Sequence, residues 1–157
     1  MKSPAITSIA LFTLIFLAGS GLAQSNKGKP NKGVTASTLN DAWQRIYSYH
    51  GNTATTGEPK EFVIMCDGFF SSVGQDSTGR WNVTHAGTFE VSGNTLKNSL
   101  RYSSHPERIG ATHWVEFEVN GDTLTLRFFK KFITAQGQDL TAQMPKDVIA
   151  KYVRAKK

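Results

Sequence analysis

The sequence predicts an antiparallel all-β fold, and three observations lead to this prediction. From Phe62 onward, apolar and polar residues alternate with a period of two, which is typical of strands buried on one face. Turn-forming dipeptides separate the alternating segments, namely Asp67-Gly68, Gly93-Asn94 and Gly121-Asp122. No segment of helix length interrupts this pattern before about residue 135.

The N-terminal residues 1–23 have the features of a secretory signal peptide. Lys2 precedes the apolar stretch Ile9–Ala18, and the small residues of Gly21-Leu22-Ala23 suit a signal peptidase. A retained membrane anchor is the alternative, but a spanning helix needs about 20 apolar residues, more than this stretch offers. We therefore expect cleavage near Ala23 and export of the mature chain as a periplasmic or secreted protein.

Positive charge is concentrated outside the predicted strands. The chain carries a formal net charge of +6, and several of its lysines lie in the segments 24–37 and 151–157. Residues 24–37 are rich in Gly, Asn and Ser, which predicts a flexible basic linker before a domain over 38–157. No basic stripe interleaved with aromatic residues follows, so we expect no nucleic-acid partner. The basic tails suit weak contact with an anionic envelope surface.

Cys66 is the single cysteine of the chain, so no internal disulfide can form. Exported small domains often rely on disulfides, and this one must rely on a hydrophobic core instead. Cys66 ends the apolar run Phe62–Cys66. We expect it to behave as a small buried hydrophobe, because no basic residue adjacent in the sequence would activate it as a reactive thiol.

The central part of the chain predicts a series of short strands. Phe62–Cys66 and Phe69–Val73 should pair antiparallel, because the Asp67-Gly68 dipeptide between them suits a type I′ hairpin turn. After a turn-rich stretch, two further strand segments follow, Arg80–Thr84 and Thr88–Val91. Each is short and bounded by polar residues, as in a meander.

Three more strands are predicted over residues 96–102, 113–119 and 124–129, with a longer polar connection, Ser103–Gly110, after the first. Alternate residues of each strand are apolar, so one face of each should point inward. Phe129 falls on the outward face of this pattern. The residues expected to point inward are Phe89, Leu96, Asn98, Leu100, Tyr102, His113, Val115, Phe117, Val119, Leu124, Leu126 and Phe128.

The two ends of the domain suit either a helix or a strand. Residues 38–51 carry a capping box and helical spacing, whereas Trp43–Tyr49 alternates aromatic and polar residues as a strand would. We expect one helical turn followed by a strand. Asp147–Ala155 has the same ambiguity, and we expect it to form the closing strand.

A meander of about eight strands, with a strand near each end, closes on itself and removes both exposed edges. The sequence therefore predicts an up-and-down β-barrel. A barrel of eight strands is wide enough either for a filled core or for one small ligand.

Several segments resemble those of small exported bacterial lipocalin-like proteins, within the calycin superfamily. Many such proteins have no known function. The resemblance covers approximately residues 38 to 155. The segments that carry it are Asn40-Asp41-Ala42-Trp43, Asp67-Gly68-Phe69-Phe70, Gln75–Trp81, Gly87–Thr95 and Tyr152-Val153-Arg154.

The resemblance implies structural roles for two residues at the ends of the domain. In lipocalin-like proteins an early Trp closes one end of the barrel and a late Arg packs across it. Trp43 and Arg154 match these positions. The usual Gly two positions before the Trp is replaced here by Asp41.

The resemblance also implies that a small, mostly apolar molecule binds inside the barrel. Asn98 and His113 are polar residues on otherwise apolar faces, and a few placed polar groups fix the orientation of a ligand in such a site. The alternative for each is a core residue that the protein itself satisfies. Candidate ligand-binding residues are Asn98, His113, Tyr102, Phe89, Phe117 and Phe128.

A second function fits the same fold. A barrel with a filled core can act through its surface, as a protein-binding module or an enzyme inhibitor, and the loop Ser103–Gly110 is a candidate for such contacts. Sequence alternation does not distinguish a filled core from a cavity.

No pattern in the sequence indicates catalysis. The chain has no G-x-S-x-G elbow, no H-E-x-x-H pair and no Gly-rich phosphate loop before a helix. The four histidines are too widely spaced for a local metal motif. We therefore expect no enzyme activity, no metal and no cofactor. Cys66 and the histidines are the candidates for the alternative, an enzyme.

Overall fold

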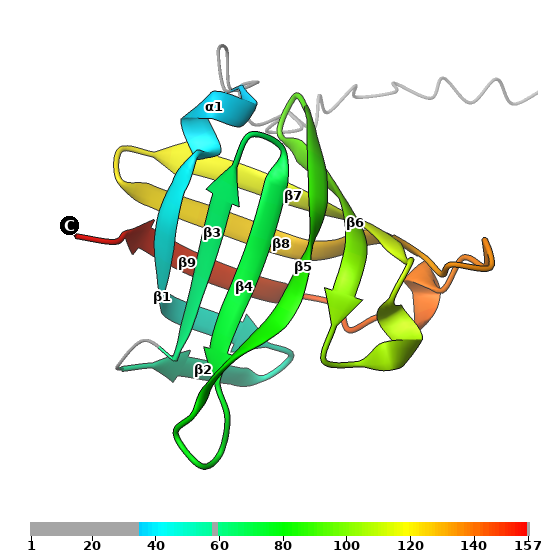
Figure 1. Ribbon diagram of the computed structural model, residues 1–157, viewed down its shortest axis with the longest axis horizontal. Coiled ribbons are helices and arrows are strands. Elements are labelled where there is room, and N and C mark those ends of the chain that lie inside the picture. The colour runs from blue at the N-terminus through cyan, green and yellow to red at the C-terminus, as the bar shows by residue number, and fades with distance from the viewer. Residues whose placement is uncertain (1–34, 58–59, 157) are drawn as a thin grey trace, which may run out of the picture.

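The computed structural model of the protein describes residues 35–57 and 60–156. The predicted signal peptide and most of the predicted linker lie outside the described residues. None of the helices in the described part is long and apolar enough to cross a membrane. The elements in chain order (Figure 1) are α1 (Ala36–Leu39), β1 (Asp41–His50), β2 (Thr53–Thr56), β3 (Glu61–Cys66), β4 (Phe69–Gln75), β5 (Trp81–Ser92), β6 (Thr95–Ser103), the 3₁₀ helix η1 (Pro106–Arg108), β7 (Thr112–Asn120), β8 (Thr123–Ile133), the 3₁₀ helix η2 (Thr141–Gln143) and β9 (Val148–Arg154).

The strands form one antiparallel sheet that closes on itself. From β3 to β9, each strand pairs with the next along the chain, while β1 pairs with β3 on one side and β9 on the other. These eight strands make a barrel, in which β3 and β4 cross in front of β8 and β9 in Figure 1. The predicted up-and-down meander that closes into a barrel is confirmed. The short β2 extends the far end of β1 as a hairpin and was not predicted.

The two ends of the domain have the expected types of element, but the helix lies earlier than the predicted capping box at residues 38–41, because its cap is Thr35. The single turn of α1 is followed directly by β1, and Asp147–Ala155 contains the closing strand β9. The turn between β3 and β4 is also as predicted, because Asp67 and Gly68 both adopt positive φ angles, 47° and 82°. Positive φ at both central residues is the geometry of a type I′ turn, which matches the twist of the paired strands.

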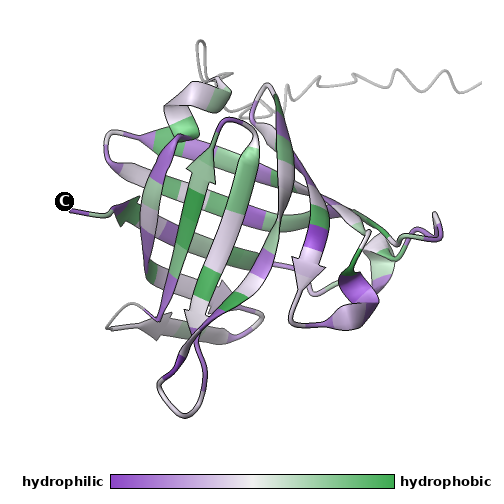
Figure 2. Ribbon diagram, in the orientation of Figure 1, coloured by the Kyte–Doolittle hydropathy of each residue, from purple (hydrophilic) through white to green (hydrophobic). Residues whose placement is uncertain are grey.

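One predicted break in the chain is absent. All of Thr88–Val91, and Arg80–Thr84 except Arg80 itself, belong to one long strand, β5, whose first part pairs with β4 and whose second part pairs with β6. The residues between them, His85, Ala86 and Gly87, remain paired with both β4 and β6. Figure 2 shows hydrophobic and hydrophilic residues alternating along such strands.

A bulge in β6 explains why Tyr102 does not point inward. Ala86 pairs with Tyr102 but Gly87 pairs with Leu100, so Arg101 is an extra residue in the ladder. A single extra residue reverses the faces of all the residues that follow it. Tyr102 is therefore 47% exposed and Ser103 is buried in its place. The predicted inward position of Tyr102 is wrong.

The prediction that Cys66 is buried is also wrong. In β3 the inward residues are Val63 and Met65, and the alternation places Ile64 and Cys66 on the outer surface. The apolar run therefore covers both faces of the strand. Because it contains no alternation of apolar and polar residues, the sequence does not indicate which face is buried.

Gly87 lies where β5 and β6 approach each other most closely at this bulge. A Cβ atom at this position would lie 1.9 Å from the backbone oxygen of Ser99. We expect Gly87→Ala to lower the free energy of unfolding by about 2 kcal/mol, because the clash is with backbone that must shift. Chemical denaturation measures the change.

Gly74→Ala is the matched control for Gly87→Ala. Its added Cβ would meet the side-chain methyl of Thr84 at 3.0 Å, which can rotate away. We expect Gly74→Ala to cost less than about 1 kcal/mol. Equal losses in the two variants would show that the close backbone approach at Gly87 is not constraining.

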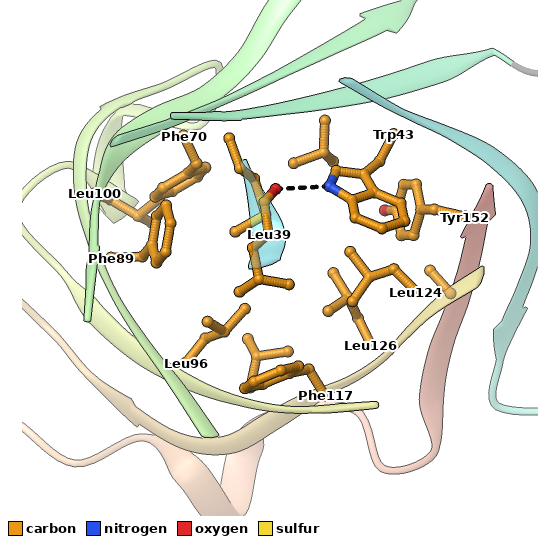
Figure 3. Close-up of a cluster of buried hydrophobic side chains, with 14 of the residues drawn as sticks. Leu39, Trp43, Phe70, Phe89, Leu96, Leu100, Phe117, Leu124, Leu126 and Tyr152 are labelled. Atoms are coloured by element: carbon orange, nitrogen blue, oxygen red, sulfur yellow. Dashed lines mark hydrogen bonds between the residues drawn. The ribbon is translucent and has the colours of Figure 1, made fainter. Parts of the chain in front are cut away.

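The hydrophobic core fills the end of the barrel beside α1, here named the closed end. Leu39, from α1, plugs this end and is fully buried. Figure 3 shows its side chain between Phe70 and Phe89 on one side and Trp43 and Tyr152 on the other. The opposite end, where β1 ends and β9 begins, is the open end.

Candidate ligand-binding site

A cavity of about 510 Å³ extends from the open end into the middle of the barrel. Its mouth lies among the end of β1, the loop after β6 and the start of β9, which contribute His50, His105 and Val148. Every strand of the barrel contributes to the lining. The barrel is therefore packed at one end and hollow at the other.

A wide bulge in β8 supplies the aromatic wall of the cavity. Trp114 pairs with Lys131 and Glu116 with Arg127, so Val115 alone stands opposite residues 128–130. Within this bulge Phe129 adopts a φ of 60°, which is uncommon for a bulky residue.

This bulge changes which aromatic residues face the cavity. Phe128 and Phe129 both line it, together with Phe132. Phe128 has the inward position that was predicted. Phe129 was predicted to face outward, and that prediction is wrong because strict alternation fails across a bulge.

Asn98 and His113 meet on the cavity wall. They are direct partners in the pairing of β6 with β7. The side-chain nitrogen Nδ2 of Asn98 lies 3.0 Å from Nε2 of His113, and both residues line the cavity. The edge of the Phe129 ring packs against the imidazole, with 6.4 Å between ring centroids. Two predicted site residues from separate strands thus form one polar pair.

The imidazole of His113 is neutral near neutral pH. Burial, together with the nearby His85 and Arg108, lowers its pKa from 6.5 to about 4. Because an amide nitrogen can only donate, Nε2 of His113 accepts from Asn98 and the ring proton sits on Nδ1. Burial also lowers the pKa of His85, with contributions from Arg108 and His105.

A second polar group crosses the seam where β1 joins β3 and β9. Arg45 Nη1 lies 2.6 Å from Glu61 Oε2, and the Tyr152 hydroxyl donates to Glu61 Oε1 at 2.8 Å. Burial, reinforced by Glu61, raises the pKa of Tyr152 well above its ordinary value. All three residues line the cavity. The charge of Arg45 is balanced by Glu61, so it needs no anionic ligand.

Histidines and Arg108 form much of the polar part of the cavity lining. All four histidines of the chain contribute to its lining. The rings of His85 and His105 stack with centroids 6.4 Å apart, and Arg108 from η1 lies beside them. Within residues 35–57 and 60–156, no group of three or more His, Cys, Asp or Glu side chains could hold a metal ion.

Three predicted site residues lie away from the cavity. Phe89 and Phe117 are buried in the core and do not line it. Tyr102 lies on the outer surface because of the bulge in β6. The structure thus places Asn98, His113 and Phe128 at the cavity, from the six residues that were predicted.

Trp43 and Arg154 form the structural closure of the other end. Trp43 is fully buried, and its Nε1 donates to the carbonyl oxygen of Leu39 at 2.9 Å. The guanidinium of Arg154 lies 4.5 Å from the Trp43 ring centroid. The same guanidinium pairs with Asp41, so the acid that stands in place of the usual Gly serves to hold this arginine.

Solved structures share this architecture. A lipocalin-like protein from Bacteroides uniformis superposes with a TM-score of 0.52 at 13% sequence identity, covering 74% of this chain and 98% of that one. The fold is a lipocalin-like barrel. An uncharacterized protein from Bacteroides eggerthii gives a TM-score of 0.50 at 10% identity, covering 74% of this chain and 99% of that one.

The similarity between this chain and the two solved structures is a similarity of fold, and the sequence resemblance had predicted this fold. No protein-family model matches this sequence, and no curated protein matches it. Any statement about what the barrel holds therefore rests on its own side chains.

The cluster of Arg45, Glu61 and Tyr152 was not predicted from the sequence. Strand alternation could have predicted it. Arg45 follows the inward Trp43 by two residues and Glu61 precedes the inward Val63 by two, so both positions fall on the inward face. Charged residues in a strand are ordinarily assigned to the solvent-exposed face, which is why these two were not predicted to point inward. The cluster is held together by pairing between strands far apart in the chain.

Proposed function

We propose that this protein is an exported, non-enzymatic carrier that binds one small, mostly apolar molecule inside its lipocalin-like barrel. The cavity of about 510 Å³ is the observation that carries this proposal. Sites for small molecules typically have volumes of about 300–1,000 Å³, with apolar walls and a few placed polar groups. The aromatic wall of β8 and the pair of Asn98 and His113 match that description.

The cavity also favours a carrier over the alternative function. A barrel that works only through its outer surface has no need for a hollow interior, and unfilled core volume reduces stability. Retaining about 510 Å³ of open space is therefore better accounted for by a ligand. Export is proposed from the sequence, because the apolar stretch Ile9–Ala18 precedes the small residues at 21–23.

The proposal is tested by filling the cavity from one wall. Ser72 of β4 lines the cavity, whereas its neighbour Ser71 points to the opposite face of the strand. We expect wild-type protein to bind the uncharged fluorophore N-phenylnaphthylamine with one site per chain. Ser72→Trp should weaken this binding by at least about tenfold, because the indole occupies the space of the ligand.

Ser71→Trp is the matched control, and we expect it to bind the fluorophore as the wild type does. Circular dichroism confirms that each variant is folded, and Ser72→Leu replaces Ser72→Trp if the larger side chain prevents folding. Equal binding by wild type and a folded Ser72 variant would place the fluorophore outside the barrel and contradict the proposed function.

A further inference from the structure

A buried hydrogen-bond acceptor on the cavity wall has no partner. Asn98 is 8% exposed and lines the cavity. Its Oδ1 is the one buried side-chain nitrogen or oxygen atom without a hydrogen-bond partner in the part of the chain that the structure describes. Buried polar side-chain atoms are nearly always paired, so each exception requires an explanation.

The other half of the same amide fixes the direction of Oδ1. Nδ2 of Asn98 donates to Nε2 of His113, which is free to accept because the imidazole is neutral. The amide is planar, so an Nδ2 atom engaged with His113 leaves Oδ1 turned away from the imidazole. Asn98 therefore presents an acceptor, rather than a donor, to a molecule in the cavity.

We infer that the molecule bound in the cavity carries an uncharged hydrogen-bond donor, a hydroxyl or an amide N–H, which donates to Oδ1 of Asn98. This inference rests on the proposed function and names the class of ligand for that site. The rest of the molecule is apolar, because the aromatic side chains of Phe128, Phe129 and Phe132 form the adjacent wall.

The charges around Asn98 exclude the charged alternatives. A carboxylate has only acceptor oxygens, so it leaves Oδ1 unpaired and sets two acceptors against each other. An ammonium group can donate, but the positive charge of Arg108, which acts on the adjacent His113, makes this wall unfavourable for a cation. Arg45 is already paired with Glu61 and does not call for an anion. A neutral alcohol or amide satisfies the acceptor without these costs.

The inference is tested with three probes of equal chain length, namely decanol, decane and decanoate. Each is titrated against wild-type protein that holds N-phenylnaphthylamine, and the dissociation constant follows from displacement. We expect decanol to bind about tenfold more tightly than decane, the ratio that one net hydrogen bond supplies. We expect decanoate to bind more weakly than decanol.

Asn98→Leu removes the acceptor while keeping a similar side-chain size. In this variant we expect the preference for decanol over decane to be lost, because the hydroxyl no longer has Oδ1 as its acceptor. Ser99→Ala, at the neighbouring position on the opposite face of β6, is the control and should keep the wild-type ratio. The ratio in the wild type tests the inference even if Asn98→Leu fails to fold.

The possible failures are distinguishable. If the fluorophore and all three probes fail to bind, the proposed function is wrong and the inference fails with it. If the probes bind but decane equals decanol in the wild type, the cavity is a binding site and Oδ1 does not select the ligand. If decanoate binds most tightly, the ligand is an anion recognised at the mouth, near Arg108, and the inference is overturned.

Discussion

Trp43→Ala should lower the free energy of unfolding by about 4 kcal/mol, within the range for loss of a large aromatic core side chain. Trp43 is 0% exposed, and its removal leaves a large void at the closed end of the barrel. It also deprives the Leu39 carbonyl of its donor and removes the ring under the Arg154 guanidinium. Urea denaturation gives the change as a shift of the midpoint at constant slope.

Trp81→Ala provides the control for this change. Trp81 is the same residue type but is 46% exposed, and its main ring contact is with Phe62 on the outer surface. We expect Trp81→Ala to lower the free energy of unfolding by about 1 kcal/mol or less. If Trp43→Ala were as mild as Trp81→Ala, the closed end would not depend on this tryptophan.

The second large effect is a loss of stability in acid through His113. The pKa of this imidazole is 6.5 when exposed and about 4 in the folded protein. The unfolded chain therefore binds the proton first as the pH falls, and stability declines between these two values. We expect His113 to account for about 3 kcal/mol of this decline, at 1.36 kcal/mol for each pKa unit.

His113→Phe should remove that part of the pH dependence. The measurement is the free energy of unfolding of both proteins at several values between pH 6.5 and pH 4, where the wild-type curve should fall more steeply than that of the variant as the pH falls. Phe132→Leu alters the same wall without a titrating group and should keep the wild-type slope. Parallel curves for wild type and His113→Phe would mean that His113 titrates normally in the folded state.

The fold was predictable because its determinants are local. Alternation with a period of two identifies a strand from its own residues, and Asp67-Gly68 specifies its turn through the φ angles it tolerates. The closing strand β9 followed from the same kind of pattern, whereas the capping box placed the helical turn a few residues too late in the chain. Antiparallel neighbours joined by short turns leave few alternative topologies.

The site was only partly predictable, because bulges and long-range pairing decide it. An extra residue at Arg101 moved Tyr102 outward, and the bulge at Phe129 brought that side chain into the cavity. Neither bulge has a marker in the sequence. Asn98 and His113 could each be assigned to an inward face, but their meeting depends on the register between β6 and β7.

The volume left unfilled inside the barrel could not be predicted from the sequence either. Phe89, Phe117 and Phe128 all have inward positions, yet the first two fill the closed end and only Phe128 borders the cavity. Their depth along the barrel follows from how the strands are staggered. A pattern that repeats every two residues carries no information about this depth.

Native mass spectrometry of the gently purified protein tests the central claim, that the barrel holds a ligand. We expect the wild-type chain to carry an adduct of roughly a few hundred daltons, the size that fits a cavity of this class. The adduct should persist in Ser71→Trp and be absent from Ser72→Trp. An adduct retained by folded Ser72→Trp, or wild-type protein that carries no adduct and takes up no fluorophore, would contradict the proposal that the barrel holds a ligand.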